Sequence, residues 1–215
     1  MSKNFTRDNE KFKPEPSVLV ICEDTKSSKS YLDEACYKLR ADVHIELSHC
    51  GNTDPLGIVK AAIKRKKSFE FVLCVIDRDT HENFFEATGL AKQNNIYPVI
   101  SYPCFEFWLL LHFKYSRKPY NKAGSKSPAD LLIADLKKIT EMENYEKGSA
   151  KLLYSYLSDR LPQARINSAK ALAEAKLIDT YNPSTTLDVI LDFFSELAVP
   201  KKTYVKINEL LNKLP

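Results

Sequence analysis

The sequence predicts an α/β protein in which a parallel-rich sheet has helices on both faces and a helical region follows it. Two continuous apolar runs rich in β-branched residues, at 17–22 and 71–76, are typical of parallel strands that are buried on both faces. Stretches with helical spacing alternate with the strands, which favours right-handed strand–helix–strand crossovers. Beyond residue 114 we expect no further strand, so the second half of the chain is expected to be helical.

The N-terminal half alternates strands and helices in a regular order. After the first strand, apolar residues recur at helical spacing from Tyr31 to Leu39, and Ser27 or Ser28 is placed to cap that helix. The other elements expected in this half are a strand at 43–48, a helix at 55–67, the strand at 71–76, a helix at 82–94, a strand at 96–101 and a helix at 104–113.

The C-terminal half shows only helical spacing, interrupted by prolines. The helices expected there cover 128–140, 150–159, 162–177, 185–198 and 203–213. The chain therefore divides into a polar lead-in at 1–16, an α/β domain at 17–113, a basic loop at 114–127 and a helical region at 128–215.

Composition and charge exclude several classes of protein. The 215 residues are 44% hydrophobic and 28% charged, as in ordinary globular proteins and unlike disordered chains. No apolar stretch approaches the roughly 20 residues that span a bilayer, and the N-terminus does not resemble a signal peptide, so we expect a cytoplasmic protein with no membrane partner. The five cysteines lack zinc-binding spacing and are expected to be free thiols. A net charge of +4 by itself says little about nucleic acid.

Carboxylates follow three of the expected strands. Glu23 comes directly after the first strand, Asp77 and Asp79 come at the end of the third, and Glu106 lies shortly after the fourth. The carboxyl ends of parallel strands share one crevice, where unpaired carboxylates raise each other's pKa. A divalent cation relieves this repulsion, and Mg²⁺ accepts carboxylate, water and substrate phosphate oxygens. The pattern predicts a Mg²⁺ or Mn²⁺ site, with a merely solvated turn as the alternative for the Asp-x-Asp pair.

Basic side chains provide candidate contacts to nucleic acid. Lys26 and Arg78 lie next to the carboxylates and are placed to contact a phosphate, although Lys26 could equally be solvated and Arg78 could pair with the acids. Tyr115 and Tyr120 in the 114–127 loop are suited to stacking on unpaired bases. A solvated surface is the alternative for this loop. Its candidate nucleic-acid-binding residues are Lys114, Arg117, Lys118 and Lys122.

The two histidines near these motifs, His81 and His112, are expected to have structural rather than catalytic roles. His81 follows Asp79 by two positions and is interpreted as a surface residue. His112 lies in the apolar stretch after Glu106, six positions further along, and therefore not on the same helical face. We interpret His112 as a hydrogen-bonded core histidine rather than a catalytic base.

The acidic motifs resemble those of the Toprim domain, which occurs in topoisomerases, primases and nucleases. They are the segments Val20-Ile-Cys-Glu-Asp-Thr-Lys-Ser27 and Cys74-Val-Ile-Asp-Arg-Asp79. The segment Ser101-Tyr-Pro-Cys-Phe-Glu-Phe-Trp-Leu-Leu-Leu-His-Phe113 is similar to the signature of the RloB-like subfamily, as are 144–147, 164–169 and 182–186. The resemblance extends over residues 17 to 197.

This resemblance implies roles for the acidic residues. The glutamate after the first strand of Toprim proteins acts as an acid or base or as a metal ligand, and this role falls on Glu23. The Asp-x-Asp pair holds Mg²⁺, which implies the same for Asp77 and Asp79. Glu106 matches an acid of the RloB-like signature. The chain departs from many Toprim proteins at Asp24, where they have glycine, and this carboxylate either perturbs the site or faces water.

The resemblance also implies a function, with two alternatives. It implies a Mg²⁺-dependent nuclease of bacterial anti-phage defence, often encoded beside an ATPase partner, that acts on RNA (tRNA being one candidate) or DNA; small RNA-maturing Toprim enzymes favour RNA. One alternative is a non-catalytic partner module of a defence ATPase complex. The other is a haloacid-dehalogenase-type phosphatase with Asp77 as the nucleophile. The position of the Asp-x-Asp motif argues against it, because that family carries its nucleophile motif on the first strand and this chain carries it on the third. The oligomeric state stays open.

Overall fold

A mostly parallel five-stranded sheet forms the centre of the protein. The computed structural model describes residues 16–39, 44–79, 81–148, 152–199 and 204–214. The strands are β1 (Val18–Cys22), β2 (Ile45–Ser48), β3 (Phe71–Asp77), β4 (Tyr97–Tyr102) and β5 (Ser184–Thr185). Their order across the sheet is β2-β1-β3-β4-β5, with the first four parallel and β5 antiparallel to β4. The parallel strands thus bring their carboxyl ends to one side of the molecule.

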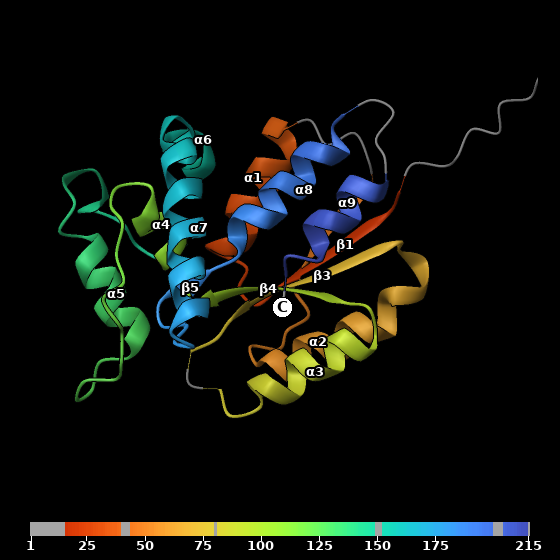
Figure 1. Cartoon of the computed structure of the whole chain (residues 1–215), viewed down its shortest axis with the longest axis horizontal. Coiled ribbons are helices and arrows are strands. Elements are labelled where there is room, and N and C mark those ends of the chain that lie inside the picture. The colour runs from red at the N-terminus through yellow and green to blue at the C-terminus, as the bar shows by residue number, and fades with distance from the viewer. Residues whose placement is uncertain (1–15, 40–43, 80, 149–151, 200–203, 215) are drawn as a thin grey trace, which may run out of the picture.

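Helices cover both faces of this sheet (Figure 1). One face carries α2 (Pro55–Arg65) and α3 (Phe84–Gln93), and the other carries α1 (Ser28–Leu39), α8 (Leu187–Leu197) and α9 (Tyr204–Leu211). The start of α2 follows from its sequence, because the Asp54 carboxylate accepts the N–H of Gly57 at 2.8 Å and Pro55 occupies the first turn.

Four further helices gather beyond the carboxyl ends of the parallel strands, on the left of Figure 1. They are α4 (Glu106–Leu111), α5 (Pro128–Leu136), α6 (Leu153–Leu157) and α7 (Leu161–Leu177). Short 3₁₀ turns occur at Lys66–Ser68, Thr140–Met142 and Ser158–Arg160. A capping box fixes the start of α5, where the side chains of Ser127 and Asp130 each accept the other's backbone N–H. These helices surround the side of the sheet on which the acidic motifs end.

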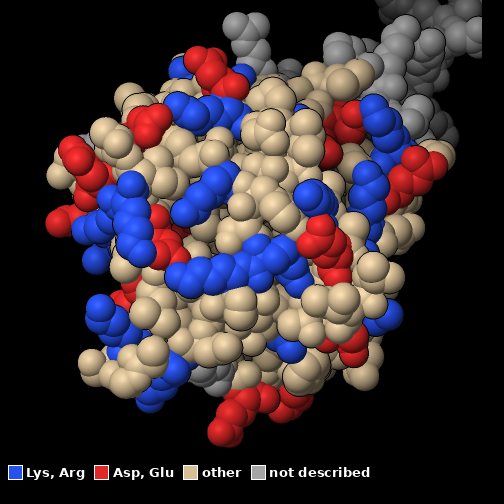
Figure 2. All heavy atoms as spheres, turned by 60° about the vertical axis from the view of Figure 1, so that its left-hand side comes forward, with Lys and Arg blue, Asp and Glu red and all other residues tan. Residues whose placement is uncertain are grey.

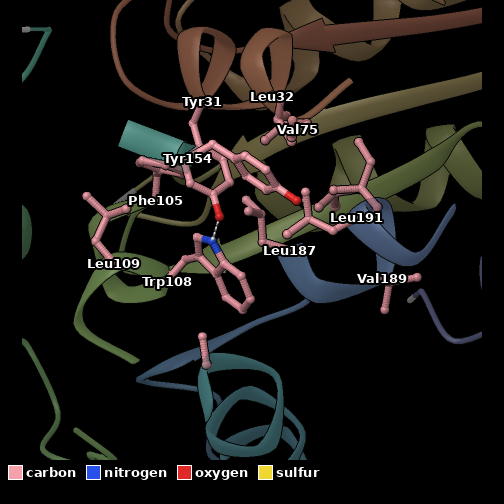
Figure 3. Packing of buried hydrophobic residues seen from close by; sticks show 14 of the residues in the cluster. Tyr31, Leu32, Val75, Phe105, Trp108, Leu109, Tyr154, Leu187, Val189 and Leu191 are labelled. Carbon is pink, nitrogen blue, oxygen red and sulfur yellow. Dashed lines mark hydrogen bonds between the residues drawn. The ribbon is translucent and has the colours of Figure 1, made fainter. Parts of the chain in front are cut away.

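The sheet separates two hydrophobic cores. The larger core lies on the side of α1 and α8 and includes Tyr31, Phe105 and Trp108, which are all fully buried. Figure 3 shows the Trp108 indole N–H donating to the Tyr31 hydroxyl at 2.9 Å, so both polar atoms have a partner inside the core. Because both faces of β1 and β3 are covered, every residue of these strands except Asp77 is buried. Continuous burial explains their uninterrupted apolar sequence.

The predicted fold class is confirmed: a mostly parallel sheet is flanked by helices, and the C-terminal part is helical. The expectation of no strand after residue 114 is wrong, because β5 adds to the edge of the sheet and the side chains of Ser101 and Thr185 are hydrogen-bonded at 2.8 Å. Both residues of β5 are polar, and two residues are too few to show a strand period. All five cysteines are free, as expected. The lead-in at 1–15 lies outside the described residues.

Candidate functional site

The β1–β3 pairing brings two of the predicted acids together. Cys22 pairs with Val75, so Glu23, one residue further, lies beside the end of β3. The Glu23 backbone N–H donates to Val75 O at 3.1 Å, and the backbone N–H of Asp77 donates to Glu23 Oε2 at 2.9 Å. The parallel pairing of β1 and β3 therefore brings Glu23 and Asp77 together at the carboxyl end of the sheet, as the sequence predicts.

Glu106 is buried in the first turn of α4 and has two partners from a later segment. Its side chain is fully enclosed, the Tyr145 hydroxyl donates to Oε1 at 3.0 Å, and Lys147 Nζ lies 3.5 Å from Oε2. The Tyr145 hydroxyl also lies 3.4 Å from Ser27 Oγ. These contacts tie the segment before α6 to the loop after β1, and they place one cation beside the acids.

Asp79 is held by the turn that follows β3. The N–H of Arg78 donates to Ser101 O at 2.8 Å, and the N–H of Asp79 donates to Pro103 O at 3.1 Å. Its Oδ1 is buried and has no hydrogen-bond partner among the described residues, whereas the buried Glu106 Oε2, which also lacks a hydrogen bond, faces Lys147. Buried carboxylate oxygens are normally hydrogen-bonded, so Asp79 Oδ1 is a candidate acceptor for a ligand.

Burial and mutual repulsion shift the titration of the cluster. Burial raises the pKa of Glu23 to about 7, and the charges of Asp24 and Asp79 contribute, while the Asp77 N–H and Lys147 oppose the rise. Asp77 is partly exposed as a residue, but its carboxyl group is desolvated, and this desolvation, followed by the charges of Glu23 and Glu106, raises its pKa well above the usual value. Burial alone would lower the pKa of Lys147, but the neighbouring acids, Glu106 above all, raise it. The protein without a bound cation therefore favours the protonated forms of Glu23 and Asp77.

The donor set fits a hard divalent cation. Mg²⁺ in proteins is held by one or two carboxylates together with waters and substrate phosphates. Glu23, Asp77 and Asp79 could supply carboxylate oxygens, and a cation beside Glu23 and Asp77 would offset both the burial and the mutual repulsion that raise the pKa values of these two groups. Within the described part of the chain, no three His, Cys, Asp or Glu side chains form a ready-made coordination group. Such a cation would therefore draw further ligands from water and substrate.

Several residues of the site have contacts that the sequence does not predict. His81 keeps 31% of its side chain exposed, as the sequence predicts for a surface residue, but its Nε2 also lies 3.9 Å from Glu23 Oε1. Tyr145 and Lys147 are site residues that the sequence does not predict, although they lie in the segment 144–147, which is similar to the RloB-like family. Their contact with Glu106 depends on tertiary packing across 39 residues of sequence, which no local pattern reveals.

The loop after β1 carries the two residues whose roles were open. The Asp24 carboxylate accepts the backbone N–H groups of Lys26 and Ser27 at 2.7 and 2.5 Å, so it organises the turn before α1, while its charge still raises the pKa of Glu23. Lys26 is exposed and lies against Gly148, where an added Cβ would meet its side chain at 2.8 Å. Lys26 thus lies beside the segment that carries Lys147.

The predicted nucleic-acid contacts of the 114–127 loop are largely occupied by the protein itself. Arg117 donates to the carbonyl oxygens of Pro183 and Thr180, and Lys118 pairs with Asp135. Tyr120 is buried and donates to Asp135 at 3.1 Å, so its predicted stacking on bases is wrong. The Tyr115 hydroxyl donates to Glu174. Lys114 and Lys122 are exposed. Figure 2 shows basic groups interleaved with acidic ones on the face of α5–α7.

His112 is the core histidine that the sequence predicted. It is buried, and its Nδ1 lies 2.9 Å from Trp108 O. Burial lowers the pKa of His112 to about 4, so the ring is neutral at physiological pH. The side chain packs edge-on against the Trp108 ring, on the inner side of α4.

Fold and site together define an α/β protein whose acidic residues gather at the carboxyl ends of a parallel sheet. A model of the family described as RloB-like protein matches residues 18–193, and the chain belongs to this family. No curated protein and no solved structure matches the chain. Over the described residues, no helix has both the length and the apolar character needed to cross a bilayer.

Proposed function

We propose that the chain is a Mg²⁺- or Mn²⁺-dependent nuclease of the Toprim type. The proposal is supported by the meeting of Glu23 and Asp77 at the ends of β1 and β3, and by a buried oxygen of Asp79 that has no hydrogen-bond partner among the described residues. Glu23, Asp77 and Asp79 would hold the metal. When bound, the metal would activate water and offset charge on the leaving oxygen of a phosphodiester.

The protein's own groups suit the proton transfers of such a reaction. Glu23, with its pKa raised to about 7, is able to accept and return a proton near neutral pH. His81 Nε2 lies 3.9 Å from Glu23 Oε1, which is beyond hydrogen-bond distance but close enough for the two groups to interact electrostatically. Lys147 is fixed beside Glu106 and would attract a phosphate oxygen once a substrate replaces part of the solvent. Glu106 and Tyr145 position this lysine.

We further propose that the substrate is RNA, with tRNA as one candidate, or DNA, and that the activity serves anti-phage defence in the cytoplasm beside an ATPase partner. Membership of the RloB-like family supports this part of the proposal, together with the resemblance of the acidic motifs to Toprim nucleases. Exposed Lys26, Lys114 and Lys122 remain candidates for contacts to the nucleic-acid backbone.

A cleavage assay tests the proposal. Total RNA, single-stranded DNA and duplex DNA are incubated with the purified chain and Mg²⁺ or Mn²⁺, alone and with the protein encoded beside it. Cleavage by the wild type is expected, with a loss of at least a hundredfold in Asp77→Asn. The control Glu209→Gln changes an exposed acid in α9 and is expected to cleave normally. Survival of all three nucleic acids under every condition would contradict the proposal.

A non-catalytic partner module of an ATPase complex is the second candidate. One observation favours it: the described residues contain no preformed group of three metal-ligating side chains. This alternative predicts that Asp77→Asn protects cells from phage as well as the wild type does. The nuclease proposal predicts that the substitution abolishes protection while the protein stays folded.

A further inference from the structure

A cavity of about 520 Å³ is lined by Arg78, the residue between Asp77 and Asp79 in the turn after β3. It is bounded by α3, the outer strands β4 and β5, α7 and the chain after α9, and its volume is within the roughly 300–1,000 Å³ usual for ligand sites. Four basic side chains line it and none of its described lining residues is acidic. The basic residues are Arg78, Lys92, Lys176 and Lys213.

Aromatic rings hold the arginine of this cavity in place. The Arg78 guanidinium lies 4.8 Å from the ring centre of Tyr102, 4.9 Å from that of Phe84 and 5.1 Å from that of Phe85. Cation–π contacts use the faces of the rings. They leave the N–H groups of the guanidinium free to form bidentate hydrogen bonds to an anion such as a phosphate. Phe85 is 71% exposed, so much of its ring surface stays accessible to a ligand beside the Arg78 guanidinium.

We propose that this cavity binds an unpaired nucleotide of a single-stranded nucleic acid. The inference rests on the proposed nuclease function and specifies its substrate as a strand with at least one unstacked base. The base would stack on the exposed Phe85 ring, and the phosphate would bind Arg78 and the three lysines. Aromatic rings beside a basic groove are the usual means of holding single strands, since every base has a face on which to stack.

The position of the cavity relative to the acids supports this assignment. Arg78 stands between Asp77 and Asp79 in the turn after β3, and that turn is fixed to the end of β4 by backbone hydrogen bonds. A nucleotide held by Arg78 would therefore place a neighbouring phosphodiester of the same strand at the acidic cluster. A duplex keeps its bases stacked and could not offer one to Phe85 without unpairing.

A binding assay without cleavage tests the inference. The protein carries Asp77→Asn and is kept in EDTA, and fluorescence anisotropy follows a labelled single-stranded 12-mer RNA and a duplex of the same sequence. Phe85→Ala is expected to weaken single-strand binding by about 5- to 150-fold, since base stacking contributes about 1–3 kcal/mol. Duplex binding is expected to change less than twofold. Tyr37→Ala, an 81% exposed ring on α1, is the matched control and is expected to bind normally.

A second variant examines the phosphate contacts. Replacing Lys92, Lys176 and Lys213 together by glutamine is expected to weaken single-strand binding and to reduce the slope of log affinity against log salt by about 2. The inference is overturned if the single strand does not bind, if Phe85→Ala binds it as the parent does, or if both forms lose affinity equally. It is also overturned if a mononucleotide competes as well as the 12-mer, since the cavity would then bind a free nucleotide.

These results are independent of the nuclease assay. If Phe85→Ala loses single-strand binding but cleavage does not depend on Asp77, the cavity binds a nucleotide and the proposed catalytic site is wrong. If cleavage depends on Asp77 but Phe85→Ala binds the single strand normally, the nuclease proposal stands and the cavity is not the nucleotide-binding site.

Discussion

Replacing Glu23 by glutamine is expected to stabilise the metal-free protein at alkaline pH. The side chain is largely buried, and its pKa rises from 4.5 to about 7, mainly through burial. A carboxyl group whose pKa rises on folding holds its proton more tightly in the folded state, so stability falls as the pH increases from about 4.5 through about 7. Each pKa unit corresponds to about 1.4 kcal/mol, which puts the penalty above pH 7 at up to about 3 kcal/mol.

Urea unfolding in EDTA measures this penalty, with the single tryptophan, Trp108, as the fluorescence probe. At about pH 8, Glu23→Gln is expected to be more stable than the wild type by about 1–3 kcal/mol, because glutamine keeps an acceptor for the Asp77 N–H without the charge. At about pH 5 the gain is expected to shrink below about 1 kcal/mol, since the glutamate is then protonated in the folded protein.

The matched control for this experiment is Glu209→Gln, which removes an exposed carboxylate in α9 and is expected to change stability by less than about 0.5 kcal/mol at either pH. A variant Glu23→Gln that is less stable than the wild type at pH 8 would refute the reasoning. So would a stability gain that stays the same at both values of pH.

Two further substitutions test the packing around the site. Tyr31→Phe leaves the buried Trp108 N–H without its acceptor and is expected to cost about 1–3 kcal/mol in urea unfolding, whereas Tyr37→Phe on the 81% exposed ring is expected to be neutral; equal stability of the two variants would contradict the importance of that bond. Gly148→Ala and Gly51→Ala both place alanine at positive φ, but only the first brings a Cβ within 2.8 Å of a side chain. We expect the Gly148 variant to lose about 1 kcal/mol more than the Gly51 variant, and an equal loss would mean that the close approach is not significant.

The buried strands and the acidic residues at their ends were the features that the sequence predicted best. β1 and β3 are covered on both faces, so their sequences are continuously apolar and end where the chain reaches the polar edge. Glu23 directly follows β1 and Asp77 is the last residue of β3, and the parallel pairing alone brings them together. Their convergence was therefore predictable from the positions of the strands.

Contacts made by isolated side chains were not predictable in the same way. Lys118 and Tyr120 lie in a basic loop that suggested nucleic-acid binding, yet both contact Asp135 of α5, a partner that becomes apparent only when the loop and helix are packed. Lys147 reaches Glu106 from a segment without periodic pattern. β5 has two polar residues, and its place in the sheet follows from tertiary pairing with β4.

A manganese-soaked crystal tests the central claim most directly, because Mn²⁺ is identified by its anomalous scattering. We predict an anomalous peak between Glu23, Asp77 and Asp79, at about 2.0–2.3 Å from carboxylate oxygens of at least two of them, and no such peak in crystals of Asp77→Asn. A protein that diffracts well at saturating Mn²⁺ with no peak at these residues, or with the peak elsewhere, would contradict the account.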